Sequence, residues 1–262
     1  MQLAQQKYSK LLNTIYIKPD IRGKTFFQDQ IGAWAMETKA GRNSQTPNND
    51  PALDRRMGTM VTYHDARLLD RSDELRCISD PRSAYAIAAG QSVGRQVDDI
   101  ILASAYATAY YGETGSSSTT NGNIVLVTAA SPTVAQIVAV KKALDDNDVD
   151  MEDRYFVTNT TLLNKLLGVT EATSSDYASV KALVRGEIDT WLGFKWIMTT
   201  RLSTTYVGIA YQKTGICLGI AENPIVRTDE RTDLSYSWQI YYELDMGAVR
   251  LEEDKVVLVK EG

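Results

Sequence analysis

Two stretches of alternating residues, separated by a long polar segment, constrain most strongly what this chain can fold into. The run TFFQDQIGAWAMETK occupies residues 25–39 and the run MGTMVTYHDARLL occupies residues 57–69, and both have the period of β-strands. The segment between them is rich in Asn, Pro and Gly, which is typical of a loop. A strand of about fifteen residues is about 50 Å long, whereas a compact chain of this size has a radius of gyration of about 18 Å. Because an isolated two-stranded ribbon is marginally stable, we expect this arm to lie on another subunit.

A single long helix is predicted after the arm. Asp80 and Pro81 are the residue types of a helix N-cap and a first helical position. Apolar residues then recur at helical spacing to about Tyr111, which predicts a helix about 46 Å long. Gly90 and Gly94 lie inside it, and each costs about 1 kcal/mol relative to Ala. Either close packing against a sheet or a permitted bend would explain these two glycines.

Beyond a Gly- and Ser-rich connector at 112–122, helices and strands alternate, which predicts a separate α/β layer domain. The expected elements are a strand at 124–128, a helix opened by Ser131-Pro132 and ending near Leu144, a strand at 154–159, short helices over TLLNKLLG and DYASVKALVRG, and strand-like runs over WLGFKWIMTT, TTYVGIAYQ and GICLGIAE. The tail, SYSWQIYYELDMGAVRLEEDKVVLVK, is interpreted as two strands.

Charge and composition exclude several classes of function. The chain has 28 Lys and Arg against 33 Asp and Glu, a net charge of −5, and 1 His. This acidity disfavours a protein that grips phosphate backbones, and the single His excludes multi-His metal centres. No apolar run approaches the roughly 20 residues of a membrane span, and we expect no secretory signal. Cys77 and Cys217 are expected to be reduced structural thiols.

No group of residues in the sequence has the pattern of a catalytic or metal site. The acidic turn 145–153 has Asp at calcium-loop spacing, but Met151 stands where that loop requires Gly and Val157 where it requires Glu. His64 and Asp65 are adjacent on a strand, so they point to opposite faces and cannot form a dyad. We therefore expect no catalytic residue, no metal and no cofactor. Two adjacent acidic pairs are interpreted as solvated faces: Asp98-Asp99 and Glu252-Glu253.

The order of these elements resembles the major capsid proteins of tailed bacteriophages, the podophage-type family with the HK97-like fold. SQTPNNDPALDRRMGTM followed by TYHDARLLDRSDELR is similar to the extended loop of that family and its return. DPRSAYAIAAGQSVGRQVDDIILAS is similar to its spine helix. RYFVTNTTLLNKLLG, VKALVRGEIDTWLGFKWIMTTRL and MGAVRLEEDKVVLVK resemble its axial-domain and C-terminal signatures. The resemblance covers essentially the whole chain.

The resemblance implies an α+β, HK97-like capsid fold. Its expected parts are an N-terminal arm (1–22), an extended β-hairpin E-loop (23–70), a peripheral domain with the spine helix and a β-sheet (71–121 and 228–262), and an α/β axial domain (122–227). It implies a late structural protein of the virion that self-assembles, as homo-pentamers and homo-hexamers, into an icosahedral shell in the host cytoplasm. The shell would enclose double-stranded DNA without sequence-specific binding. Scaffolding, portal and decoration proteins are the further expected partners, and no membrane is involved.

Contacts between subunits are expected on the E-loop, although its mixed charges equally fit a solvated hairpin face. The residues expected to make these contacts are Trp34, Lys39, Arg55, Arg56, Asp65 and Arg67. Deleting residues 36–58 is expected to leave a folded protein that no longer closes shells. An encapsulin-type nanocompartment, distinguished by an enclosed cargo enzyme, is an alternative. A carboxylate-dependent hydrolase using the turn 145–153 is a more distant alternative.

Overall fold

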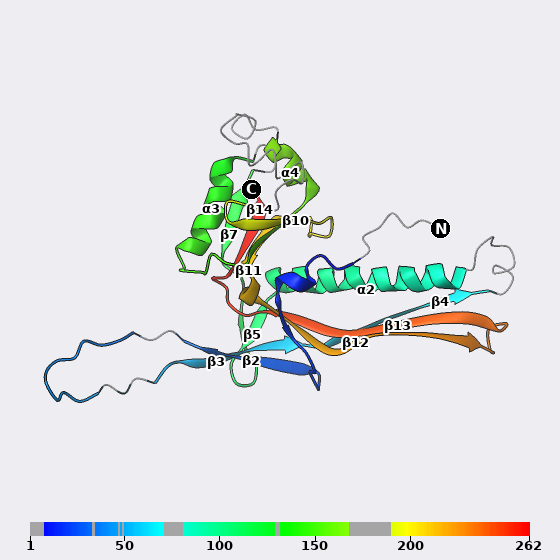
Figure 1. Ribbon diagram of the computed structural model, residues 1–262, viewed down its shortest axis with the longest axis horizontal. Helices are drawn as coiled ribbons and strands as arrows, with labels where there is room; N and C mark the ends of the chain where they lie inside the picture. Colours follow the sequence, from blue (N-terminus) through cyan, green and yellow to red (C-terminus); the bar gives the residue numbers. More distant parts are fainter. Residues whose placement is uncertain are drawn as a thin grey trace.

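The protein is described by a computed structural model in which residues 8–32, 35–46, 48, 50–70, 81–128, 132–167 and 190–262 are placed (Figure 1). An upper lobe of helices and strands stands on a long layer, in which one helix runs over extended strands. An arm projects from this body to the left of Figure 1. Three hydrogen-bonded sheets correspond to these three parts.

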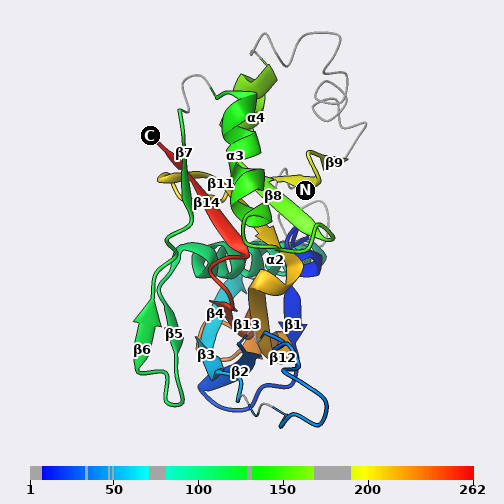
Figure 2. The ribbon, with the colours of Figure 1, turned by 90° about the vertical axis from the view of Figure 1, so that its left-hand side faces the viewer.

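A six-stranded sheet with the order β7-β14-β11-β8-β10-β9 forms the upper lobe. Its strands are β7 (Ile124–Val127), β8 (Arg154–Thr158), β9 (Thr190–Trp191), β10 (Phe194–Met198), β11 (Tyr206–Gln212) and β14 (Val256–Glu261). Helices α3 (Val134–Asp145) and α4 (Thr160–Leu167) pack on the face that carries Phe156 (Figure 2). Tyr155 and Val157 point to the other face, which packs toward the long helix below. All five residues of β8 are buried because the sheet is covered on both faces.

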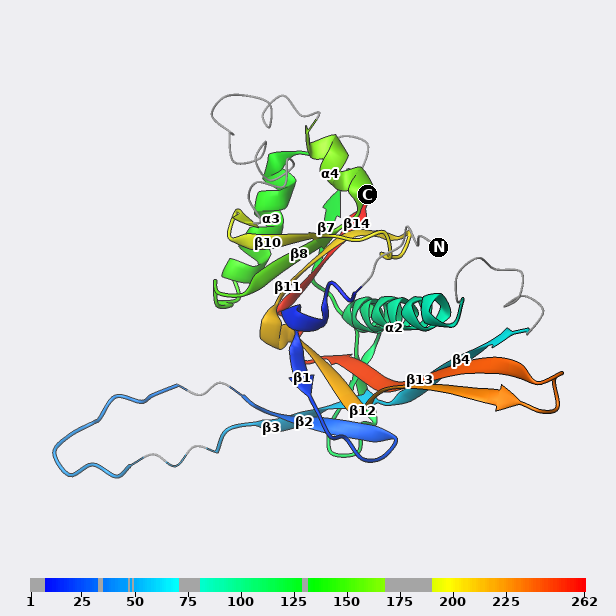
Figure 3. The same cartoon turned by 45° about the vertical axis from the view of Figure 1, so that its right-hand side comes forward.

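The long layer combines a four-stranded sheet, in the order β1-β12-β13-β4, with the spine helix α2. Its elements are η1 (Leu12–Thr14), β1 (Tyr16–Lys18), β4 (Val61–Leu69), α2 (Pro81–Tyr106), η3 (Lys213–Gly215), β12 (Ile216–Arg231) and β13 (Ser237–Arg250). The helix has 26 residues and is about 39 Å long. It lies along β13 (Figure 3) and buries Ile101 and Leu102 in the same core as Leu218 and Leu244. The predicted N-cap, Asp80, lies outside the described residues.

The third sheet, β2-β3-β5-β6, carries the arm. Its strands are β2 (Thr25–Ile31), β3 (Leu53–Thr59), β5 (Ala109–Tyr111) and β6 (Ser117–Thr119). The β2–β3 hairpin pairs from Thr25 with Thr59 to Ile31 with Leu53, so the predicted hairpin is confirmed. Its first strand is shorter than expected, about 23 Å rather than about 50 Å. Residues 32–52 connect the two strands, and we call them the arm loop.

The second predicted strand, 57–69, is divided between two sheets, which corrects the expectation of one continuous strand. β3 pairs with β2, whereas β4 pairs with β13 from Val61 to Leu69. The crossing is possible because Gly247 of β13 has no side chain. A Cβ at this position would stand 2.1 Å from the carbonyl oxygen of Thr59. The chain therefore passes directly over Gly247 as it leaves one sheet for the other.

Four further differences have local causes. The spine helix ends at Tyr106 instead of Tyr111 because residues 109–111 pair with β3 as strand β5. The segment 112–122, expected as a flexible connector, forms the turn and second strand of the β5–β6 hairpin. WLGFKWIMTT forms two strands around a turn in which Leu192 and Gly193 have positive φ. The cap of α3 is Thr133, in a capping box with Gln136. The helix predicted over DYASVKALVRG lies outside the described residues.

The strand pairing also differs from the expected domain ranges at several points. β12 belongs to the sheet of the spine-helix layer, although its residues 216–227 fall in the range expected for the axial domain. β4 belongs to the sheet of the spine-helix layer, although it falls in the range expected for the E-loop. β14 lies between β7 and β11 in the upper lobe, although 228–262 was expected to accompany the spine helix. The reason is the apolar sequence VVLV of β14, which is buried on both faces between the two cores of the molecule.

Candidate assembly surface

The arm loop is the most exposed part of the described chain. Apart from Ser44, each described residue between 35 and 50 is exposed, and the side chain of Met36 is 96% exposed. Gly32 donates its backbone N–H to Ala52 at 2.7 Å, which closes the hairpin below the loop. Beyond that bond the loop extends away from the body (Figures 1 and 3). The side chain of Met36 therefore does not pack on the core of its own subunit.

The base of the arm, in contrast, is fixed to the body by three side chains. Lys18 Nζ donates to the carbonyl of Phe27 at 2.8 Å, and Gln30 Nε2 donates to the carbonyl of Leu251 at 2.7 Å. Arg56 Nη2 donates to Glu253 Oε2 at 2.6 Å. The loop is therefore presented from an anchored hairpin, and the change from anchored to exposed backbone falls at Gly32 and Ala52.

The predicted contact residues on the arm have different environments. Trp34 lies outside the described residues, and Lys39 is exposed on the arm loop. Arg55 is half-exposed on β3, where its Nε lies 3.2 Å from Asp29 Oδ1. Arg56 points to the other face of the strand and its side chain is only 10% exposed, so its partner lies within the chain. Among the described residues of this group, Lys39 and Arg55 are accessible to another subunit, whereas Arg56 is not.

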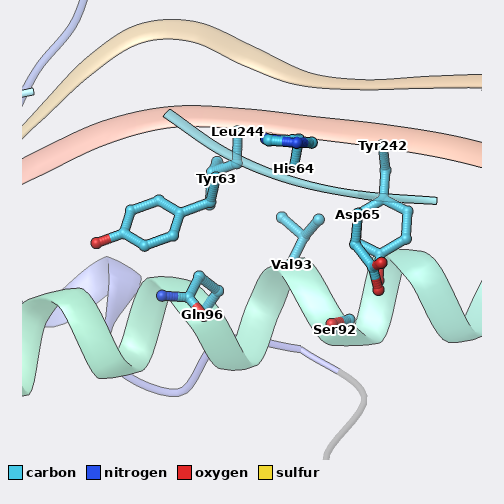
Figure 4. Close-up of a pocket in the computed structure, with 8 residues that line it drawn as sticks. All are labelled: Tyr63, His64, Asp65, Ser92, Val93, Gln96, Tyr242 and Leu244. Carbon is cyan, nitrogen blue, oxygen red and sulfur yellow. The ribbon is translucent and has the colours of Figure 1, made fainter. Parts of the chain in front are cut away.

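Asp65 and Arg67 are remote from the arm loop, because β4 lies in the sheet under the spine helix. Asp65 lines a cavity of about 240 Å³ between β4, β13 and α2 (Figure 4). Asp65 Oδ2 accepts a hydrogen bond from Tyr242 at 2.8 Å and lies 3.1 Å from Arg67 Nη2. The Tyr242 hydroxyl, more than Arg67, holds the pKa of Asp65 below its ordinary value. Asp65 and Arg67 therefore lie on a different sheet from Arg55 and Arg56.

His64 and Asp65 both line this cavity, but their side chains are directed differently. Figure 4 shows Asp65 and Tyr242 directed toward Ser92 of the spine helix. The His64 ring lies instead 6.3 Å from the ring of Tyr241. The arrangement agrees with the alternation of side chains along a strand.

The acidic turn 145–153 surrounds a buried arginine. Arg154 donates to Asp145 Oδ1 at 2.5 Å and to the carbonyl of Asp150 at 2.8 Å, and it also bonds the carbonyl of Val149. Within the described ranges, His, Cys, Asp and Glu side chains do not gather in groups of three or more that could hold a metal ion. The turn thus has a structural explanation in the packing of Arg154.

The acidic pair Asp98-Asp99, interpreted from the sequence as solvated, is corrected by the structure. Asp98 is fully buried and accepts hydrogen bonds from Ser9 Oγ at 2.6 Å and from the backbone N–H of Lys10 and Leu11, each at 3.1 Å. Its neighbour Asp99 pairs with Arg201 of the upper lobe. The spine helix thus holds the N-terminal segment with one carboxylate and the upper lobe with the next.

Cys217 is buried in β12, and burial raises the pKa of its thiol to about 11. Cys77 lies outside the described residues. Among the described helices, none combines the length and the apolarity needed to cross a membrane.

Solved capsid structures share this architecture. The capsid of the cyanophage P-SCSP1u matches with a TM-score of 0.80 at 15% identity, over 100% of this chain and 90% of that chain. Mycobacterium phage Ogopogo matches with a TM-score of 0.74 at 13% identity, over 100% and 94%. The mature capsid of bacteriophage PhiM1 matches with a TM-score of 0.72 at 10% identity, over 100% and 89%. At such identities the likeness establishes the fold, which is the HK97-like fold of capsid shell subunits.

The sequence identifies the family. Residues 1–261 match the profile of the family described as phage capsid protein, so the chain belongs to that family. No curated protein gives a significant sequence match. The protein is therefore a structural subunit of a bacteriophage capsid and not an enzyme. Membership in this family favours the phage shell over the encapsulin-type nanocompartment, and the proposed hydrolase has no support from it.

Proposed function

We propose that copies of this chain form homo-pentamers and homo-hexamers, in which the arm loop of each subunit lies on its neighbour. One observation carries the proposal: residues 32–52 extend from an anchored hairpin and leave Met36 exposed on the described protomer. A projecting element that contacts a different surface of the next copy makes a heterologous contact, and such contacts close into rings. Rings of two sizes then combine into an icosahedral shell.

The proposal gives each part of the chain a role. Residues 1–22 form the N-terminal arm and 23–70 the E-loop, while 71–121 with 228–262 form the peripheral domain and 122–227 the axial domain, whose tips would meet around the symmetry axes. The strand pairing supports assigning β4 to the peripheral domain and β14 to the axial domain. Lys39 and Arg55 are the exposed arm residues that we assign to the contact, and Asp65 and Arg67 would offer charges on the spine-helix layer.

The enclosed molecule would be double-stranded DNA, held without sequence-specific contacts. The net charge of −5 supports this proposal, because an acidic wall does not bind the phosphate backbone tightly. Scaffolding, portal and decoration proteins would be the other partners, with assembly in the host cytoplasm.

Replacing the arm loop tests the proposal. We expect a variant in which residues 35–50 are exchanged for a short Gly-Ser linker to fold normally and to form no closed particles. The deletion of 36–58 considered from the sequence is too wide for this purpose, because it removes most of β3 and the pairing of β3 with β2. Circular dichroism and thermal unfolding report on the fold, and electron microscopy reports on the particles.

The control exchanges Ser116 and Ser118, in the exposed β5–β6 hairpin, for Ala. It changes a second projecting hairpin and is expected to leave shell closure intact. Closed shells of normal size from the arm-loop replacement would contradict the assignment. Absence of shells from the unmodified protein, with its partners supplied, would contradict the proposed function itself.

A further inference from the structure

Two buried arginine side chains and one partly buried glutamate meet where the arm joins the body. Arg56 lies on β3, Arg250 ends β13, and Glu253 lies in the turn between β13 and β14. Glu253 Oε2 accepts a hydrogen bond of 2.6 Å from Arg56 Nη2, and Glu253 Oε1 accepts one of 3.4 Å from Arg250 Nη2. One carboxylate thus links the arm to the body, and we call these three residues the joint.

Arg250 extends the link to the spine helix. Its side chain is fully buried, and Nη1 donates to the carbonyls of Ala105 and Ala107, each at 2.9 Å. These carbonyls stand at the C-terminal end of α2, where a helix leaves acceptors without intrahelical partners and carries partial negative charge. Nη2 also donates to the carbonyl of Thr119 in β6 at 3.3 Å. Arg250 therefore links Glu253 to the C-terminal end of the spine helix.

Stability alone explains the joint poorly. Buried ion pairs often contribute no more than well-packed apolar side chains, because both charges lose their hydration. In addition, Arg56 Nε and Nη1 and Arg250 Nε are buried without a hydrogen-bond partner among the described residues. Burial also lowers the pKa of Arg250, which reflects the cost of its charge in this place. Apolar side chains would fill the same space at a smaller cost.

Charged hydrogen bonds supply what apolar contacts do not, namely a fixed direction. Arg56 is held at Nη2 by Glu253, and its guanidinium lies 5.3 Å from the centre of the Tyr111 ring. Tyr111 is also the strand partner of Arg56 in the β3–β5 pairing. The guanidinium is thus oriented by a carboxylate from the turn between β13 and β14 and by an aromatic ring of the neighbouring strand β5.

We propose that Glu253, held by Arg250 at the end of the spine helix, is a positioning residue that sets the direction of the arm and hence the angle at which one subunit reaches the next. The proposal rests on the proposed function of the arm loop. A small rotation at the base of the arm gives a large displacement at its tip. Half of the arm loop spans about 33 Å when extended, so a rotation of about 10° at the base moves the tip by about 6 Å. A displacement of this size would separate a closed ring from an open one.

The substitution Glu253→Gln tests this role, with Glu252→Gln as its matched control. Glu252 is the preceding residue, but its side chain is 46% exposed and pairs with Lys255 at 2.9 Å. We expect both variants to fold. Electron microscopy should show at least tenfold fewer closed shells for Glu253→Gln than for the control. Hydrogen exchange of the unassembled protein should be at least tenfold faster at the amides of 53–59.

A double-mutant cycle distinguishes positioning from general destabilisation. Arg56→Met breaks the same link but leaves Glu253 paired with Arg250, so it keeps the test valid if Glu253→Gln fails to fold. We expect Arg56→Met to show the same closure defect, and the double variant to be no worse than either single one, because the two residues act through one contact. Arg56→Lys, which keeps a charge toward Glu253, should restore part of the closure.

Two results would overturn the proposal. The first is shell yield and amide exchange of Glu253→Gln equal to those of Glu252→Gln. The second is closure defects that add in the double variant. Should the unmodified protein form no shells, the proposed function fails, whereas the exchange measurement on unassembled protein still decides whether Glu253 orders the arm.

Discussion

Gly90 and Gly94 lie one turn apart on the spine helix and have different surroundings. A Cβ at Gly90 would meet nothing within 4 Å, whereas a Cβ at Gly94 would stand 2.9 Å from Ser9 N and 3.2 Å from Tyr8 C. Close packing therefore explains Gly94, although against the backbone of the N-terminal segment and not against a sheet.

These surroundings predict opposite effects of the same substitution. Gly90→Ala should stabilise the protein by about 0.5–1 kcal/mol, because Ala is the better helix former and the site is open. Gly94→Ala should destabilise it by about 1–3 kcal/mol, because the N-terminal segment must move away from the helix. Urea unfolding of the two variants measures both values. Equal stability of the two would contradict the packing described for Gly94.

Single acidic residues were the hardest feature to interpret from the sequence. The sequence predicts solvated pairs at Asp98-Asp99 and Glu252-Glu253, yet Asp98 and Glu253 each hold an element of the fold in place. Their partners are far away in the chain: Asp98 binds residues 9–11, and Glu253 binds Arg56. Neighbouring sequence carries no information about such partners. Gly94, one turn before Asp98, was the local sign that another backbone approaches the helix there.

At the scale of elements, the passage of the chain over Gly247 determines how two sheets connect. We expect Gly247→Ala to destabilise the protein by about 3 kcal/mol or more, because its Cβ would stand 2.1 Å from Thr59 O and both partners are strand backbone. Ala248→Gly, one position along, removes a Cβ and should cost about 1 kcal/mol. Thermal unfolding compares the two. A tolerated Gly247→Ala would show that the crossing does not need the glycine.

Elements with strong local signals were predicted well, and those fixed by distant pairing were not. The spine helix has helical periodicity and a proline at its first position, and the apolar run of β8 lies where the sequence predicts a buried strand. The segment 112–122, in contrast, has the composition of a loop, and Ser117–Thr119 becomes a strand only because it pairs with β5. The division of 57–69 likewise depends on β2 and β13, which lie on opposite sides of it in the sequence.

For the molecule as a whole, the lowered pKa values of three carboxyl groups predict that stability decreases in acid. Each has a pKa below the ordinary value of 3.8 because of a hydrogen bond that it accepts: Asp65 from Tyr242, Asp153 from Lys195 and Asp233 from Arg231. The unfolded chain binds protons at these sites more readily than the folded one, so their contribution is complete above about pH 4 and is lost as the pH falls through the folded pKa values.

The measurement is the unfolding temperature between pH 7 and pH 2. We expect it to fall below about pH 4, with a shallower fall for Tyr242→Phe, which removes the largest cause of the Asp65 shift. The difference between the two curves should be small, because Asp65 is largely accessible to solvent. A steeper fall for Tyr242→Phe would contradict the assignment of that hydrogen bond.

Because the chain is synthesised from its N-terminus, the upper-lobe strand β14 is made long after the strand β7 with which it pairs. β14 is inserted between β7 and β11, yet about 130 residues separate it from β7 in the chain. At typical rates of translation, the ribosome needs on the order of 10 s to make that stretch. During this interval the upper lobe lacks an inner strand, and β7 lacks the strand with which it pairs. We therefore expect a nascent chain that stalls before residue 256 to leave β7 unpaired and the upper lobe incompletely folded, so that only a finished chain presents the complete fold of the subunit.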